Sequence, residues 1–361
     1  MKQYLNLLQN IIDNGVEKES GRANMPNTIG ISRAMIEMDL QEGFPLLTTK
    51  KMFWKGIIHE LLWILRGDTN IKYLVDNNVN IWNGDAYRWY LRYCDGMGIA
   101  EEDRFSIEEF IETIKAGHLD RFTKKSQGVK PEELGSVVFL YFLGDLGKVY
   151  GFQWRKQNGV DQVKKVIDGL KENPYSRYHI INAWNAADFK DMALPPCHLL
   201  YQFIVRPMTF DQRHNEYARL NHGMRLNFDS IDRVTKAFDE LGVPKFYLDL
   251  NMYQRSCDTL LGVPFNLASM SLLLMIIAKA SNMKEGVAAW IGGDTHLYVN
   301  HISIAKMQIK RTPYDLPYMI IDKELKSLDD ILALTIDDFK LKGYVSHPKI
   351  DAELFTGYKK L

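Results

Sequence analysis

The sequence lacks an excess of charge of either sign, because 45 lysines and arginines balance 45 aspartates and glutamates among its 361 residues. No overall field therefore attracts nucleic acid or an anionic membrane, and an anionic ligand has to be held by a local cluster. Cysteine is also scarce: Cys94, Cys197 and Cys257 are an odd number without CxxC spacing. This argues against a disulfide framework or a four-cysteine zinc site and suits a reducing cytosol.

Long hydrophobic runs are missing as well. The first residues have neither the basic start, the apolar run nor the cleavage site of a signal peptide. The longest apolar stretch, 264–282, is interrupted by asparagine, serine and lysine, which predicts a buried helix and no membrane span. With 46% hydrophobic and 12% aromatic residues, the composition is that of a globular protein. We expect a cytoplasmic location.

Nothing in the sequence divides it into parts, since it has no internal repeat, low-complexity tract or Pro/Gly/Ser linker. We therefore expect one catalytic domain over residues 1–361. Apolar residues at helical spacing predict helices at 53–66 and 161–170.

Short runs of β-branched and aromatic residues predict strands at 179–183, 198–205 and 246–253. Strands and helices without regular βαβ alternation favour an α+β fold over a doubly wound sheet. Two stretches, at about 84–143 and 206–245, are of mixed or polar composition. We interpret both as insertions into the domain, the first with a helix at SIEEFIETIKAG.

A cysteine and a histidine follow a rigid Pro-Pro turn in the sequence from Ala193 to His198, at the entrance to an apolar strand. A thiolate is a potent nucleophile, but only a few per cent of an unperturbed thiol is ionised at neutral pH. Catalysis by Cys197 would therefore need a nearby cation or dipole. A buried structural cysteine is the alternative that these six residues leave open.

The segment YQRSCD combines an amide, a guanidinium, a hydroxyl and a carboxylate near the end of a predicted strand. Arg255 and Ser256 could hold a phosphate there, or the segment could be a solvated strand end. Asn266 lies at the start of the apolar helix, where it could be only a cap. Its amide also has the donor and the acceptor needed to bind the N3–H and O4 edge of uracil.

Two further motifs contain polar side chains that could either take part in a functional site or be structural. His296 and Tyr298 lie two apart, on one side of an extended segment, where they could bind sugar hydroxyls or be satisfied core residues. His59 and Glu60 resemble the start of HExxH, but Trp63 occupies the position of the second ligand, so no metal site is expected. Burial of Glu60 on this apolar helix would raise its pKa and suit a proton shuttle, unless an internal arginine or lysine pairs with it.

The sequences of these motifs and their order along the chain resemble those of the thymidylate synthase family. The matching phrases are FPLLTTKK (44–51), HELLW with RGDTNIKYL (59–74), NIWN (80–83), VYGFQWR (149–155), SRYHIINAWN (176–185), MALPPCH (192–198), YQRSCD (253–258), GVPFNLAS (262–269), GGDTHLYVNH (292–301) and SHP (346–348). They span nearly the whole chain, so chance agreement is negligible.

The resemblance implies a large mixed β-sheet with flanking helices and one sheet face at a homodimer interface. It implies reductive methylation of dUMP at C5 with 5,10-methylenetetrahydrofolate, giving dTMP and dihydrofolate. Cys197 would add to C6, and Arg255 would lower the pKa of the thiol. The residues implied to bind dUMP are Arg22, Arg177, Gln254, Arg255, Ser256, Asn266, His296 and Tyr298.

The same resemblance implies roles for the remaining candidates. Glu60 would move protons at O4 and the folate through ordered water, Tyr150 would assist removal of the C5 proton, and His198 would order water. Asp258 would orient pyrimidine and folate. Arg177 resembles an arginine that the family lends to the partner's phosphate, so a homodimer with two composite sites follows. The residues implied to bind folate are Trp82, Asp258, Leu261 and Gly262.

Three features depart from the family's usual pattern. Tyr178 follows Arg177 where two arginines are common, the phosphate loop reads RANMPN from Arg22, and the C-terminus runs on through 351–361. All three concern phosphate binding or closure, so a deoxyuridylate hydroxymethylase, which adds water to the methylene intermediate and gives 5-hydroxymethyl-dUMP and tetrahydrofolate, is the alternative. Asn266 stands where deoxycytidylate hydroxymethylases have aspartate, which favours uracil. A non-catalytic relative that binds nucleotide or RNA is a remote third possibility, and the balanced charge provides no basic stripe for RNA.

Overall fold

The computed structural model describes residues 1–21, 25–117, 143–226 and 230–353. Its centre is a mixed six-stranded sheet in the order β1-β2-β6-β5-β4-β3. Strands β5 and β6 are parallel and the other neighbours in this sheet are antiparallel. The predicted α+β fold is confirmed. The bounds are β1 Val16–Lys18, β2 Thr28–Asp39, β3 Ile180–Asn182, β4 His198–Pro207, β5 Phe246–Asp258 and β6 Lys284–Tyr298, and a separate two-stranded sheet consists of β7 Tyr318–Ile321 and β8 Phe339–Lys342.

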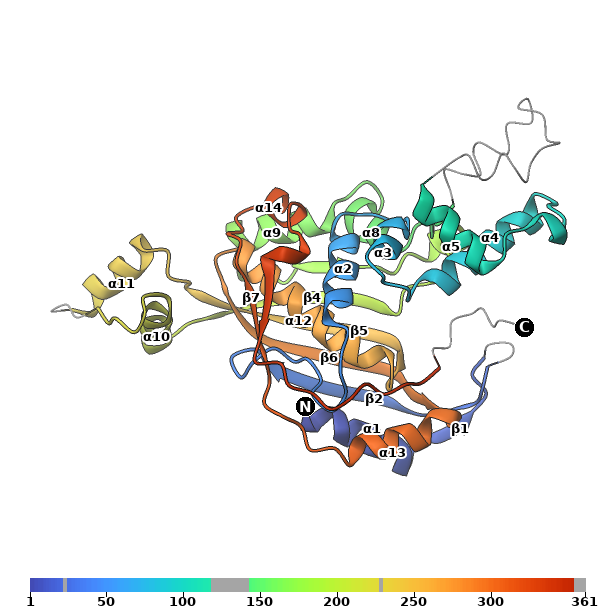
Figure 1. The fold of residues 1–361 in the computed structure, drawn as a ribbon. Coiled ribbons are helices and arrows are strands. Elements are labelled where there is room, and N and C mark those ends of the chain that lie inside the picture. The colour runs from blue at the N-terminus through green and yellow to red at the C-terminus, as the bar shows by residue number, and fades with distance from the viewer. Residues whose placement is uncertain (22–24, 118–142, 227–229, 354–361) are drawn as a thin grey trace.

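Helices flank the sheet and extend beyond its ends (Figure 1). The α-helices are α1 Lys2–Asn14, α2 Trp54–Leu65, α3 Lys72–Asp76, α4 Asn83–Gly96, α5 Ile107–Ala116, α8 Tyr150–Lys156, α9 Gln162–Glu172, α10 Phe210–Leu220, α11 Ile231–Glu240, α12 Gly262–Ala280, α13 Ile302–Ile309 and α14 Leu328–Leu332. Short 3₁₀ helices lie at Glu101–Asp103, Ala186–Asp191, Val299–His301 and Ile336–Asp338. Helix α12 packs on β5 and β6, and α2 packs on α12.

The predicted elements are found close to their expected positions. The helices expected at 53–66 and 161–170 correspond to α2 and α9, and Asp161 caps α9 by accepting a hydrogen bond from the backbone N–H of Lys164. The three predicted strands correspond to β3, β4 and β5. The helix expected in SIEEFIETIKAG is α5, which begins with a capping box formed by Ser106 and Glu109.

Helix α12 confirms that the longest apolar stretch is a buried helix. Among the described residues it is the one helix long and apolar enough to cross a membrane. However, 72% of its most apolar 18-residue segment is buried inside the protein. Leu272, Leu273 and Leu274 are at most 1% exposed. Apolar residues surround this helix on every side because it lies between the sheet and α2, so it is the central helix of the core.

Two local expectations are corrected by the structure. β5 continues to Asp258 instead of ending near Tyr253, because Ser256 and Asp258 pair with residues of the parallel strand β6. Asn266 is not a cap, since α12 begins earlier and its N-cap is Leu261. Its side chain is consequently placed inside the first turns of the helix, where it is available for other contacts.

The stretch at 206–245 contains α10 and α11, which stand apart from the sheet at one end of the molecule (Figure 1). They share a small apolar cluster that includes Tyr217 and Phe238. An ion pair between Glu216 of α10 and Lys284 of β6, both buried, joins them to the sheet. Burial would raise the pKa of Glu216, but the hydrogen bonds and charges of Arg219 and Lys284 lower it overall. The interpretation of this stretch as an insertion stays a prediction.

Candidate active site

Cys197 lies in the Pro-Pro turn directly before β4 and is half-buried, whereas Cys94 and Cys257 are buried. The guanidinium of Arg255 fixes this turn, because its Nε donates to the Pro196 carbonyl oxygen at 2.7 Å and its Nη2 to the Pro195 oxygen at 2.8 Å. The backbone N–H of Arg255 also donates to the Cys197 carbonyl oxygen at 2.8 Å. The arginine that sequence reasoning assigned to the thiol and the phosphate thus also holds the backbone that carries the thiol.

The cysteine is held from its other side by Tyr150, the first residue of α8. The Tyr150 hydroxyl oxygen accepts from the backbone N–H of Cys197 at 2.7 Å and from that of His198 at 3.4 Å. Burial raises the pKa of Tyr150 well above its usual value, so the phenol is neutral and its own O–H remains a donor. Burial also raises the pKa of Cys257 to about 12, which leaves that thiol protonated.

A chain of side-chain hydrogen bonds orients Asn266. The Trp290 indole can only donate, and it donates to Gln254 Oε1 at 2.8 Å. The Asn266 Nδ2 group donates to the same oxygen at 3.1 Å. One amide hydrogen and the carbonyl oxygen of Asn266 therefore remain for a ligand. Burial lowers the pKa of His198 to about 4, so this imidazole is neutral at neutral pH.

Glu60 projects from α2 toward Trp82, the residue at the start of α4. The Trp82 indole donates to Glu60 Oε1 at 2.8 Å, and its ring centroid lies 6.0 Å from that of Tyr150. Burial raises the pKa of Glu60, and the hydrogen bond from Trp82 offsets part of this rise. The expected effect of burial is therefore present. No arginine or lysine pairs with Glu60 in the described ranges, so the alternative of an internal ion pair is not observed.

His296 and Tyr298 end β6, and their ring centroids are 5.7 Å apart. The parallel pairing places His296 opposite Asp258 and places Ser256 opposite Asp294. The hydrogen bond with His296 and the charge of Lys18 hold the pKa of Asp294 at about 2, although burial opposes this shift. The two sugar-binding candidates therefore lie at the same end of the sheet as the YQRSCD motif.

The loop from Asp258 to Gly262 is held by groups that sequence reasoning missed. Asp258 Oδ1 accepts from the backbone N–H groups of Leu260 and Leu261 at 3.1 and 3.2 Å. The Lys50 ammonium donates to the Leu260 oxygen at 2.7 Å, and burial lowers its pKa to about 8 against the pull of the Asp258 charge. Tyr4 donates to the Thr259 oxygen at 2.9 Å. Lys50 could have been found from the sequence because it lies in the FPLLTTKK motif, whereas no sequence pattern pointed to Tyr4.

Of the remaining candidates, one lies away from this site and one cannot be placed because it is not among the described residues. Arg177 is exposed in the segment before β3, with no hydrogen bond or ion pair to the rest of the described chain. Arg22 lies outside the described residues, as do 118–142 of the first predicted insertion and the last part of the C-terminal extension. The other candidate residues come from the turn before β4, from β4, β5, β6, α2 and α8, and from the first turns of α4 and α12.

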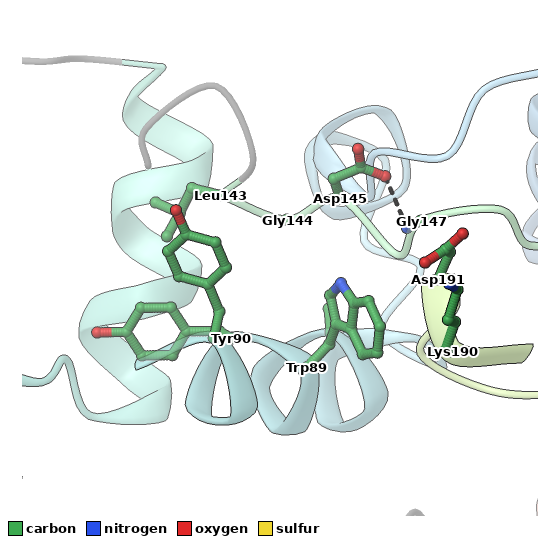
Figure 2. A pocket seen from close by; sticks show the side chains of 10 residues that line it. Trp89, Tyr90, Leu143, Gly144, Asp145, Gly147, Lys190 and Asp191 are labelled. Carbon is green, nitrogen blue, oxygen red and sulfur yellow. Dashed lines mark hydrogen bonds between the residues drawn. The ribbon is translucent and has the colours of Figure 1, made fainter. Parts of the chain in front are cut away.

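A cavity of about 300 Å³ lies between α4 and the segments that contain Gly144 and Asp191 (Figure 2). Trp89 and Tyr90 form an aromatic wall, while Lys190 and Asp191 lie at the opposite side. Cys197 does not line the cavity.

Within the described ranges, no group of three or more His, Cys, Asp or Glu side chains could hold a metal ion.

Comparison with known proteins identifies relatives along the whole chain. The family model for thymidylate synthase matches residues 2–356. The thymidylate synthase of Mesoplasma florum is 40% identical and the match covers 98% of this chain and 99% of that protein. That of Mycoplasma mobile is 39% identical with the same coverage, and that of Mycoplasma genitalium is 39% identical over 97% of this chain and 98% of that protein.

Proposed function

The chain belongs to the thymidylate synthase family, and we infer from this that it is a one-carbon methyltransferase that makes dTMP from dUMP. Methylenetetrahydrofolate is the second substrate and leaves as dihydrofolate. The observation that carries this inference is the match over nearly the full length of relatives named thymidylate synthase. These names do not favour the hydroxymethylase, which would release tetrahydrofolate instead.

We propose that Cys197 is the nucleophile that adds to C6 of the uracil ring. Arg255 and Tyr150 bind the backbone on both sides of the thiol, so the attacking sulfur has a fixed position before the nucleotide arrives. Addition to C6 places negative charge on O4. The remaining hydrogen of the Asn266 amide and water held by Glu60 would stabilise this charge as it develops.

Proton movements are assigned to the buried groups around the thiol. The raised pKa of Glu60 brings it closer to neutral pH, where it can both accept and return a proton through water. Tyr150 would assist removal of the C5 proton. His198, which stays neutral above about pH 4, would order water without adding a charge.

The nucleotide and folate contacts are proposed for residues at the same end of the sheet. Arg255 and Ser256 would hold the phosphate, and His296 and Tyr298 would bind the sugar hydroxyl. Gln254 would help hold the nucleotide through Asn266, with which it shares a hydrogen bond. Trp82 and the loop containing Asp258, Leu261 and Gly262 would bind folate. A Cβ atom added at Gly262 would lie 3.6 Å from the Asp258 Cβ atom and 3.9 Å from the Asn266 amide nitrogen, so Gly262 adjoins both groups.

We further propose a homodimer that forms through the outer face of the main sheet, and a cytoplasmic location. Met35 of β2, Ile204 of β4 and Tyr253 of β5 are 62%, 38% and 40% exposed in the single chain. Apolar side chains that gather on one sheet face favour an interface. In such a dimer, Arg177 would bind the nucleotide phosphate in the partner's site.

Product analysis tests the reaction itself. We expect incubation with dUMP and methylenetetrahydrofolate to give equimolar dTMP and dihydrofolate, measured by chromatography and by the absorbance change of the folate. Omission of dUMP is the control. Formation of 5-hydroxymethyl-dUMP with tetrahydrofolate would establish the hydroxymethylase instead, and the absence of turnover would support the non-catalytic relative.

Mixing two inactive variants tests the shared site. We expect Arg177→Glu and Cys197→Ser each to be nearly inactive alone, because one has a damaged phosphate contact and the other no nucleophile. After joint refolding, half of the dimers would be mixed and each would have one complete site, so about a quarter of the wild-type activity should return. Recovery should vanish when both substitutions are in the same chain. Activity that stays absent in the mixture would exclude donation of Arg177 to the partner.

A further inference from the structure

Tyr201 is a buried residue of β4 to which neither the motifs nor the resemblance assigned a role. It is the fourth residue of β4, is 4% exposed, and pairs with Ile181 of β3 and Met252 of β5. Its ring meets Trp154 of α8 edge to face at a centroid distance of 5.1 Å. The side chain therefore points from the sheet toward α8.

The contact with α8 places Tyr201 beside the groups proposed for proton transfer. Trp154 follows Tyr150 by four residues, and residues four apart lie on the same side of a helix. The Tyr150 ring contacts Trp82, which donates to Glu60. Tyr201, Tyr150 and Glu60 thus surround one small region between β4, α8 and α2.

Two polar groups in this region could still form hydrogen bonds. Trp154 Nε1 is buried without a hydrogen-bond partner, and no hydrogen bond joins the Tyr201 hydroxyl to another residue in the described part of the chain. Burial, followed by the nearby charge of Glu60, raises the pKa of Tyr201 far above its usual value. Tyr201 in turn contributes to the raised pKa of Tyr150, after burial and Cys197. The phenol therefore stays protonated as a donor within electrostatic range of both groups.

We propose that Tyr201 is a positioning residue for Glu60, whose hydroxyl donates a hydrogen bond to the water that Glu60 holds against the uracil ring. The inference rests on the proposed function, in which that water stabilises the charge on O4. Trp82 fixes one carboxylate oxygen, and Tyr201 would fix the water on the side of the strand. The hydroxyl neither gains nor loses a proton during the reaction, so its contribution is orientation and not acid catalysis.

The effect on pH dependence follows from the direction of this bond. Titratable groups on this side of α2 are Tyr150 from α8, and Cys197, His198 and Tyr201 from β4 and its preceding turn. His198 titrates near pH 4 and Tyr150 stays neutral. Glu60 and Cys197 therefore remain as the groups that could cause the fall of kcat at low pH, the acid limb of the pH profile. A hydrogen bond donated to the water strengthens the one that the water donates to Glu60, and this favours the carboxylate. Its loss therefore raises the pKa of Glu60 and moves the acid limb of the pH profile to higher pH.

The first test is Tyr201→Phe, which keeps the ring against Trp154 and removes the hydroxyl. We expect kcat to fall about 10-fold, as for loss of one hydrogen bond within a charged network, with KM for dUMP almost unchanged. The acid limb of kcat should shift to higher pH, while the pH dependence of Cys197 alkylation by iodoacetamide stays as in wild type. Tyr217→Phe, which removes another buried tyrosine hydroxyl far from the site in α10, should change none of these.

A second variant changes the donor without removing it. Site-specific 3-fluorotyrosine at position 201 has nearly the same shape and a more acidic phenol, so it donates more strongly and should move the acid limb to lower pH. Opposite shifts in the two variants would support the proposal. If neither variant moves the acid limb, Tyr201 only packs against Trp154 and the inference is wrong, whereas an inactive wild-type protein would contradict the proposed function itself.

Discussion

Replacing Cys197 by serine is expected to abolish turnover while leaving dUMP binding measurable. A serine hydroxyl is far less acidic than a thiol, so it supplies almost no anionic nucleophile, and kcat should fall by at least about 10³-fold. The turn itself should persist, since Tyr150 and Arg255 hold its backbone and not its sulfur. Steady-state assays would measure the loss, and calorimetric titration with dUMP would measure the retained affinity.

Cys94→Ser provides the matched control for this variant. Cys94 is a buried cysteine of α4 outside the site, so its replacement should leave kcat close to wild type. Intact-mass measurement of samples denatured during turnover with dUMP and methylenetetrahydrofolate should detect the transient covalent adduct in wild type and not in Cys197→Ser. Normal activity of Cys197→Ser would contradict nucleophilic attack by this residue.

Replacing Asn266 by aspartate is expected to change the preferred base from uracil to cytosine. The amide hydrogen that remains in Asn266 can donate to O4 of uracil, whereas a carboxylate can only accept. A protonated aspartate could donate to N3 of cytosine and accept from its amino group. Sites that hydrogen-bond a substrate group can discriminate by about 10⁴-fold or more, so kcat/KM for dUMP should fall steeply while that for dCMP rises.

The neighbours of Asn266 make this prediction specific. Gln254 Oε1 already accepts from Trp290 and from Asn266, so an ionised aspartate would face an acceptor, and this repulsion favours the protonated form. Rates with dUMP and dCMP, measured across pH, would test the change. An unchanged ratio of kcat/KM for the two nucleotides would remove Asn266 from the choice of base.

Local patterns predicted much of the fold because their signals lie within single elements. The apolar run of α12 and the helical spacing of α2 are complete in themselves. By contrast, β2 and β6 were not predicted. Strand β6 contains Gly292 and Gly293 and mixes small with polar residues, so its extended form depends on two partners that are distant in the sequence.

The candidate site was predictable as a set of residues and less so as a set of contacts. The sequence motifs pointed to Cys197 and Arg255. The hydrogen bonds from Arg255 to the Pro195 and Pro196 carbonyl oxygens, which hold the turn before Cys197, depend on tertiary geometry. The hydrogen bond between Glu60 and Trp82 joins two helices in the same way. Tyr201 carried no signal, because a buried tyrosine in an apolar strand reads as core.

The pairing of β2 with β6 has a consequence for the newly made protein. Thr28 pairs with Tyr298, and ribosomes add about 5 to 20 residues per second. Strand β2 therefore leaves the ribosome many seconds before its partner exists, with its backbone groups unpaired along that edge. Such an edge can pair with other chains, so we expect the nascent chain to depend on chaperones until β6 has emerged, and truncated transcripts to yield aggregates.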